Sequence, residues 1–357
     1  MTLKPLDGFQ SLQTHHCVTG SIRHIYVYNG HDISEEMLLG IGAGVSFSYW
    51  HFKGQPPFMG GRGNVGMAGQ EGLEKTAGRR TGVVVDKFRT GSAKKAEKAL
   101  LDMLTTGQPV MLTLDMGFLP YFDFGGKEYH FGGHVVVACG YDPASQEVLI
   151  ADRDGLHPVP KAALAQARGS KHRPFPPENE WCTFDFSDKR QPTADEVRQA
   201  ILEQAQPMLE PPISNIGVKG IRKVGQAVPR WGESMAEEEL RWALFNTYIM
   251  LSPVGGTGGG AFRYMLSRFL AEASLIAAEP RLAESAAEFQ RIGDGWQALG
   301  EWFLHTSEAP DPASHLSECA TPFRDLADQE QAAWTRLPGP ACEKWQAADN
   351  KTLDRPP

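Results

Sequence analysis

The sequence predicts an α+β fold that is followed by a mostly helical second domain, and two observations lead to this prediction. A β-branched run over 134–142 and an alternating segment over 147–152 flank a cluster of turn residues, which is typical of a β-hairpin. From Pro192 onward the pattern changes to amphipathic helices, and a capping box at 193–196 opens the first of them. Strands followed by a run of helices indicate an α+β arrangement.

Length and composition agree with two globular domains. The chain has 357 residues, of which 41% are hydrophobic and 22% charged, so each domain can bury a core of its own. We expect one domain at 1–190, a helical domain at 191–346 and a flexible tail at 347–357, where the sequence is polar.

The other elements follow from local patterns along the chain. The glycine-rich stretch at 54–80 is predicted to be either a mobile cover over a site or a long connection. Helices are predicted at 18–28, 32–39, 92–106, 193–208, 281–305 and 312–337, and strands outside the hairpin at 45–52, 110–114 and 181–186.

Charge and cysteine usage exclude several classes of protein. The formal net charge of −8 argues against a nucleic-acid binder, which would show a basic balance. Five widely spaced cysteines indicate neither a disulfide framework nor a zinc site. No apolar run follows Met1 and no window has the length of a membrane span, so we expect a cytoplasmic protein without a membrane partner.

One cysteine is placed where a helix begins. From Val18 the apolar residues recur at helical spacing until Asn29 and Gly30, a common stop. Cys17 would then lie in the first helical turn, where unpaired backbone N–H groups and the macrodipole favour a thiolate. The alternative is a buried, inert thiol.

A histidine and an acid lie at matching ends of the predicted hairpin. His134 opens the first strand and Asp152 closes the second, so in an antiparallel pair the two side chains can be neighbours. Together with Cys17 they have the chain order Cys, His, Asp of the papain-like triad. Taken singly, His134 would be a strand-capping core residue and Asp152 a turn acid.

Three stretches carry a resemblance to a known family. The helix start at His16 and Cys17, the strand at 107–115 followed by 119–121, and the segment 133–152 resemble the N-terminal domain of the butirosin biosynthesis protein H family. The glycine-rich stretch at 255–273 is similar to the helical domain that often follows.

The resemblance implies a papain-like fold that performs acyl transfer. The family's member moves an amino-acyl group from an acyl carrier protein thioester onto an amine of an aminoglycoside. By resemblance Cys17 would be the nucleophile, His134 the base and Asp152 the residue that orients the base.

Further side chains are candidates for substrate binding: Asp115, Tyr121, His16 and His130. Asp115 would hold a cationic amine acceptor, although it is equally suited to anchor a turn through backbone hydrogen bonds. His130 and His134 are separated by two glycines, which removes the helical face of a zinc-binding pair, so no metal is expected.

The oxyanion hole is predicted from the Cys17 backbone N–H together with a glutamine side chain. Gln10 and Gln13 are available, neither at the spacing of papain-like peptidases, and Gln13 is preferred.

The expected function is a cysteine-dependent acyltransferase of antibiotic biosynthesis that needs no cofactor. Its donor would be an acyl carrier protein or coenzyme A thioester carrying phosphopantetheine as substrate, and its acceptor a small-molecule amine. The alternative is a papain-like amidase or peptidase, and a third class is a binding protein on an inactive peptidase fold. The loop at 255–260 with Arg263 could contact the donor phosphate, and basic clusters at 87–98 and 219–230 could dock a carrier protein.

Overall fold

The computed structural model describes residues 3–52, 55–66, 69–126 and 128–337, and the chain divides into two compact units. The first unit is built from Met1–Leu38 and Glu74–Gln191, and the second from Leu39–Leu73 and Pro192–Pro357. The α+β class is confirmed. The first unit is therefore interrupted, because 39–73 belong to the second unit and not to the domain predicted at 1–190. The tail predicted at 347–357 lies outside the described residues.

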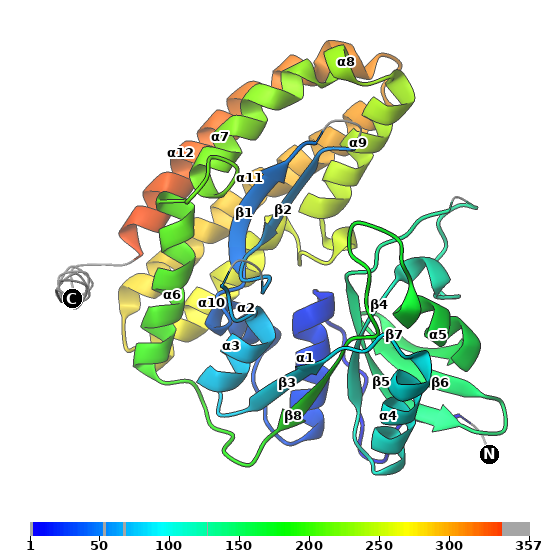
Figure 1. Cartoon of the computed structure of the whole chain (residues 1–357). Coiled ribbons are helices and arrows are strands. Elements are labelled where there is room, and N and C mark those ends of the chain that lie inside the picture. Colours follow the sequence, from blue (N-terminus) through cyan, green and yellow to red (C-terminus); the bar gives the residue numbers. More distant parts are fainter. Residues whose placement is uncertain (1–2, 53–54, 67–68, 127, 338–357) are drawn as a thin grey trace, which may run out of the picture. The chain divides into compact units, whose positions relative to one another are not determined.

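A six-stranded antiparallel sheet forms the framework of the first unit (Figure 1). Its strand order is β3-β8-β4-β5-β6-β7, so the late strand β8 is inserted between two earlier ones. The strands are β3 (Val84–Phe88), β4 (Val110–Leu114), β5 (His134–Asp142), β6 (Glu147–Asp152), β7 (Gly155–Pro160) and β8 (Trp181–Asp185).

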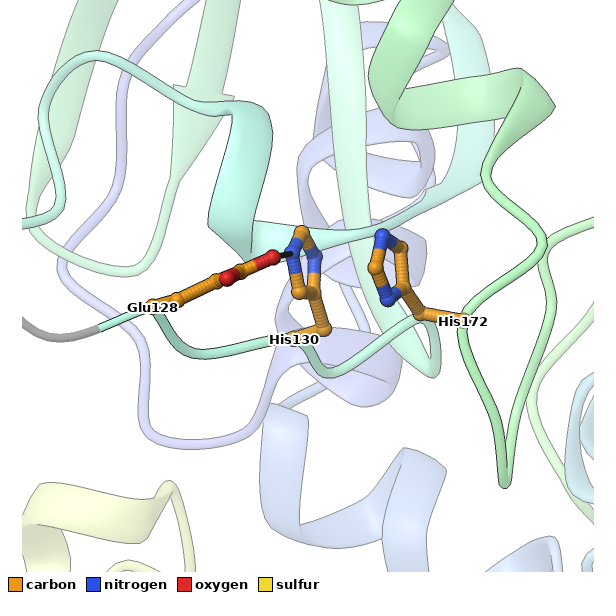
Figure 2. A group of neighbouring side chains, drawn as sticks. All are labelled: Glu128, His130 and His172. Carbon is orange, nitrogen blue, oxygen red and sulfur yellow. Dashed lines mark hydrogen bonds and ion pairs between the residues drawn. The ribbon is translucent and has the colours of Figure 1, made fainter.

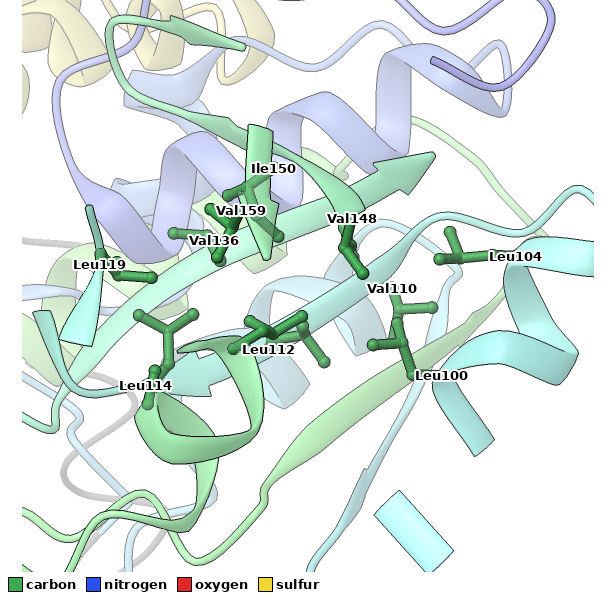
Figure 3. Packing of buried hydrophobic residues seen from close by; sticks show 13 residues of the cluster. Leu100, Leu104, Val110, Leu112, Leu114, Leu119, Val136, Val148, Ile150 and Val159 are labelled. Carbon is green, nitrogen blue, oxygen red and sulfur yellow. The ribbon is translucent and has the colours of Figure 1, made fainter. Parts of the chain in front are cut away.

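Helices pack on this sheet and complete the core of the first unit (Figure 3). They are α1 (Cys17–Tyr28), α4 (Ala93–Thr105) and α5 (Lys161–Gly169). Helix α3 (Leu73–Arg80) precedes β3 in the chain, and α2 (Glu35–Ile41) leads into the second unit. Ser92 caps α4 by accepting a hydrogen bond from the Lys95 N–H, as its sequence position predicts. Alternating residues of β4, β5 and β6 face α4 and α5, and the buried members of this cluster include Leu100, Leu104, Leu112, Val136, Ile150 and Leu164.

The β5–β6 hairpin sets the position of the predicted histidine and acid. Val137 pairs with Ala151 in the antiparallel ladder. His134, the first residue of β5, and Asp152, the last residue of β6, therefore lie at the same end of the hairpin. The helix–strand–strand order of Cys17, His134 and Asp152 is consistent with a papain-like fold.

The second unit is mostly helical and contains one two-stranded sheet. Thr193 and Glu196 form the predicted capping box at the start of α6. The hairpin β1 (Val45–Trp50) and β2 (Phe58–Arg62) packs in this unit, and Phe47 stacks on Trp296. The helices are α6 (Ala194–Leu209), α7 (Gly217–Ala227), α8 (Trp231–Ser234), α9 (Glu237–Leu251), α10 (Arg263–Ile276), α11 (Pro280–Glu308) and α12 (Ala320–Arg336).

The stretch at 54–80, in its described residues, contains β2 and α3 and is thus partly regular structure. Among the helices of the described residues, none combines the length and the apolar character needed to cross a bilayer.

Candidate active site

Helix α1 presents the thiol of Cys17 at its first residue. His16 is the N-cap in an extended conformation, and Cys17 is the first residue with helical geometry. The backbone N–H groups of this turn have no intrahelical acceptor, and they carry the positive end of the helix dipole. The local sequence therefore places a partly exposed thiol in the environment that favours its ionised form.

Two imidazoles flank this thiol. His16 Nδ1 lies 4.0 Å from Cys17 Sγ, and His134 is near enough to Cys17 to lower its pKa. His134 Nε2 lies 2.7 Å from Asp152 Oδ2, and both of these side chains are buried. Because Asp152 occupies Nε2, Nδ1 is the ring nitrogen of His134 that is available to the thiol. The structure thus brings together Cys17, His134, Asp152 and His16.

Electrostatics favour a thiolate–imidazolium pair. Burial raises the pKa of Cys17, but the charge of His16 and the hydrogen bond from His134 lower it, and the net pKa lies well below that of an ordinary thiol. Burial lowers the pKa of His134, but the charge and hydrogen bond of Asp152 raise it to about 9. Burial also opposes ionisation of Asp152, yet the charge of His134 holds its pKa at about 2. Near neutral pH all three groups are charged.

The other described cysteines have raised pKa values. Cys139, Cys182 and Cys319 are buried, and burial raises the pKa of each to about 12. Among the cysteines within 3–337, only Cys17 has a lowered thiol pKa. A selective test of thiol reactivity is therefore possible.

Two protein-family models match parts of this chain. Residues 16–153 match the family model described as butirosin biosynthesis protein H, N-terminal. Over this stretch the chain is similar to that family. Residues 162–337 match a domain of unknown function (DUF4872). No curated protein matches the chain.

The two family matches do not follow the two structural units. The butirosin biosynthesis protein H match ends just after β6, whereas α5 and β8 of the first unit fall within the second match. Because β8 lies between β3 and β4, the second match supplies an internal strand of the sheet that carries His134.

Within the segment that matches the first family, Tyr121 contacts Asp152. Its hydroxyl donates a hydrogen bond of 3.0 Å to Asp152 Oδ2, the oxygen that also contacts His134. The Tyr121 ring stacks on His157, and Phe122 packs edge-on against His134. The geometry favours a positioning role for Tyr121 over the predicted substrate contact.

Glu35 is part of this site although sequence reasoning assigned it only to a helix start. Its buried carboxylate accepts hydrogen bonds from the N–H groups of His15 (2.8 Å) and His16 (2.7 Å) and from the Thr19 hydroxyl (2.9 Å). It therefore holds the turn that leads into Cys17. The sequence shows only that two acidic residues, Glu35 and Glu36, are adjacent. This pattern does not indicate that one of them contacts the turn at His15 and His16.

Asp115 has the geometry of an anchor. Its side chain is fully buried, and Oδ1 accepts hydrogen bonds from the N–H groups of Gly117 and Phe131. Oδ2 accepts from the Ser170 hydroxyl at 2.6 Å and lies 2.9 Å from His130 Nδ1. Both oxygens are thus in use, which favours the turn-anchor alternative over an exposed binding group for an amine. His130 is held by Asp115 and lies beside Glu128 and His172 (Figure 2).

The predicted glutamine of the oxyanion hole is directed elsewhere. Gln13 is exposed, and its amide nitrogen donates to the Asp154 carbonyl at 3.2 Å. The Cys17 N–H at the start of α1 stays the predicted donor, and no contact of Gln13 supports a second one.

Arg263 does not have the exposure that a phosphate contact needs. It is fully buried and its Nε donates to Glu330 Oε1 at 2.7 Å, while Nη1 donates to the carbonyls of Ser46 and Ala261. A Cβ at Gly260 would lie 2.7 Å from the Gly293 carbonyl oxygen, so close backbone packing explains this glycine. The structure therefore contradicts the suggested phosphate site at Arg263.

The two basic clusters are partly neutralised. In the first, Lys87 pairs with Glu74 at 3.1 Å and Arg89 with Glu180 at 2.6 Å. In the second, Arg222 pairs with Asp328 at 2.7 Å. These ion pairs reduce the positive field that an acidic carrier protein would meet.

Proposed function

We propose that this chain is a cysteine-dependent acyltransferase that moves an acyl group from a thioester to an amine through a Cys17 acyl-enzyme. The observation that carries the proposal is the thiol at the start of α1, paired with a histidine whose other ring nitrogen lies 2.7 Å from Asp152. The family match supports a role in butirosin-type biosynthesis. The donor would be an acyl carrier protein or coenzyme A thioester.

In the first half-reaction the Cys17 thiolate attacks the thioester carbonyl. The oxyanion that forms would accept a hydrogen bond from the Cys17 N–H. The donor carbon–sulfur bond then breaks, and the departing thiolate takes a proton from the His134 imidazolium. The products are a thioester on Cys17, a free donor thiol and a neutral His134. One thioester replaces another, so the step is nearly isoenergetic.

In the second half-reaction an amine attacks the acyl-enzyme. Neutral His134 accepts a proton from the amine nitrogen, a carbon–nitrogen bond forms and Cys17 leaves as the thiolate. The site returns to the ion pair in which it began. Aminolysis of a thioester is downhill, and a bound amine has a large effective concentration relative to bulk reactants. Transfer then outruns hydrolysis wherever water is kept from the acyl-enzyme.

The first test is intact-protein mass spectrometry after incubation with acyl thioesters, carrier-bound and coenzyme A-bound, without an acceptor. Wild type is expected to gain the mass of one acyl group, and Cys17→Ala none. The buried Cys319 provides a matched control, since Cys319→Ala should still be acylated. If no donor leaves an acyl group on wild type, the nucleophilic mechanism is wrong.

A second measurement separates transfer from hydrolysis. Pre-formed acyl-enzyme is mixed with a panel of amines, and the loss of the acyl mass is followed with time. The proposal requires that some amine discharges the enzyme faster than buffer alone and appears as the amide product. Discharge at the same rate in every case, with only the free acid formed, would instead identify an amidase or peptidase.

A further inference from the structure

A second cluster of titratable side chains lies in the first unit and takes no part in the proposed reaction. Glu128, His130 and His172 each place one potential ligand atom within 4.8 Å of the others (Figure 2). His130 is partly buried, whereas Glu128 and His172 are exposed. Glu128 and His130 precede β5, and His172 lies on the loop after α5, so the cluster joins two separate segments.

Asp115 determines which nitrogen of His130 faces the cluster. The buried carboxylate acts as an acceptor at both oxygens, because Oδ1 accepts from the backbone N–H groups of Gly117 and Phe131 and Oδ2 accepts from the Ser170 hydroxyl. The His130 Nδ1 that lies 2.9 Å away must then carry the proton. His130 Nε2 keeps its lone pair, and it lies 3.3 Å from Glu128 Oε1. A carboxylate behind a histidine in this way is the usual support of a metal-bound imidazole.

The same carboxylate also organises His172. The Ser170 hydroxyl donates a hydrogen bond to Asp115 Oδ2 at 2.6 Å, and the backbone N–H of His172 donates one to the Ser170 hydroxyl at 3.3 Å. The rings of His172 and His130 are stacked with centroids 3.4 Å apart and an angle of 5° between planes. Parallel rings cannot both point a lone pair at one ion, so binding requires the exposed His172 ring to rotate. Nothing buried has to move.

We propose that Glu128, His130 and His172 bind a divalent transition-metal ion of the zinc type. Two imidazoles and one carboxylate suit such ions, whereas magnesium and calcium prefer oxygen ligands alone. Around a tetrahedral ion the ligand atoms would lie roughly 3.3 Å apart, so the cluster has to contract modestly from its present spacing. The ion would tie the segment before β5 to the loop after α5.

This set differs from the His130 and His134 pair that the sequence argues against. His134 is engaged with Asp152, and the additional ligand comes from a loop that only the folded chain brings close. The proposal is independent of the acyltransferase proposal, because none of its three ligands belongs to the triad.

Calorimetric titration of the full chain with zinc chloride tests the proposal. The Cys17→Ala variant is used as background, because the thiolate with His16 and His134 could itself bind zinc. One equivalent is expected to bind, and adding His172→Ala or Glu128→Gln should weaken binding by about tenfold or more. Both side chains are exposed, so neither change is expected to disturb folding. His315→Ala, an exposed histidine paired with Glu318, is the matched control and should leave binding unchanged.

Thermal unfolding gives a second readout. A ligand that binds only the folded state raises the unfolding midpoint, so zinc should stabilise the Cys17→Ala protein and do so less in its His172→Ala derivative. Equal midpoints without zinc would show that the variants fold alike. Absence of saturable zinc binding, or binding of equal strength in the His172→Ala and Glu128→Gln derivatives, would overturn the proposal.

Discussion

At the scale of single residues, the state of Cys17 depends on its neighbours more than on its own chemistry. Burial favours the neutral thiol at both Cys17 and Cys139, but at Cys139 it acts alone and raises the pKa to about 12. At Cys17 two imidazoles reverse the effect of burial. The Cys17 thiolate and the His134 imidazolium therefore exist together at pH values above the lowered pKa of Cys17 and below the pKa of His134, which is about 9.

This window predicts a pH dependence. Alkylation of Cys17 by iodoacetamide should already be fast at a pH well below the thiol pKa of about 8.5, because the thiolate is present there. Enzyme acylation should fall as the pH rises through about 9, because His134 then loses the proton that the leaving thiol needs. In His134→Ala the pH at which alkylation sets in, the acid limb of the profile, should rise toward the pKa of an ordinary thiol. Mass-resolved labelling across pH measures both limbs, and an unshifted limb in His134→Ala would contradict the ion pair.

At the scale of elements, the N-terminus of α1 is held by a side chain from α2. Glu35 accepts the N–H groups of His15 and His16, which precede the helix and would otherwise be left without acceptors. Its contact fixes the turn before Cys17, and the Cys17 N–H is not used by Glu35, so in the proposed mechanism it can serve the oxyanion. Glu36, the next residue, lies 3.9 Å from the His15 ring in an ion pair.

Replacing Glu35 should therefore impair catalysis through position. Glu35→Gln puts an amide NH₂ where an acceptor is needed, so one N–H loses its partner at a cost of about 1–3 kcal/mol in stability. We expect the rate of Cys17 acylation to fall by roughly 10- to 100-fold through misplacement of the thiol. Glu36→Gln is the matched control and should behave as wild type in both chemical denaturation and acylation kinetics. An acylation rate in Glu35→Gln equal to that of the control would exclude the positioning role.

At the scale of the whole molecule, each unit has its own polar centre. The first unit has the buried pair of His134 and Asp152, and the second has a fully buried ion pair between Arg263 and Glu330. Glu330 also accepts hydrogen bonds of 2.7 Å from the indole N–H groups of Trp296 and Trp334. Removing one member of such a pair leaves an uncompensated buried charge, which costs more than the pair contributes.

The second unit should thus be sensitive to Glu330. Glu330→Gln is expected to lower the free energy of unfolding by about 3–5 kcal/mol, whereas the double variant Arg263→Met with Glu330→Leu should recover much of that loss. Glu237→Gln, which breaks an exposed pair with Arg241, should cost no more than about 1 kcal/mol. Denaturant unfolding followed by tryptophan fluorescence measures all three. A double variant that is less stable than the single one would refute this account.

The sequence by itself determined the local elements and, through them, much of the candidate site. Helix periodicity and its stop place Cys17 at the start of α1, and strand patterns on both sides of a turn define the β5–β6 hairpin. Because antiparallel pairing joins residues near in sequence, the hairpin alone predicts that His134 and Asp152 are neighbours. Local propensity and short-range register were sufficient there.

Tertiary structure decided what depends on contacts between distant segments. The β1–β2 hairpin joins the second unit because Tyr49 donates its N–H to the Asn215 carbonyl, a contact across 166 residues that no local pattern encodes. Glu35 contacts the turn before α1 and Tyr121 contacts Asp152, again from separate elements. Which group accepts a buried hydrogen bond depends on the packing that brings donor and acceptor within about 3 Å of each other. That packing exists only when the whole core has formed, so these roles could not be read from the order of residues.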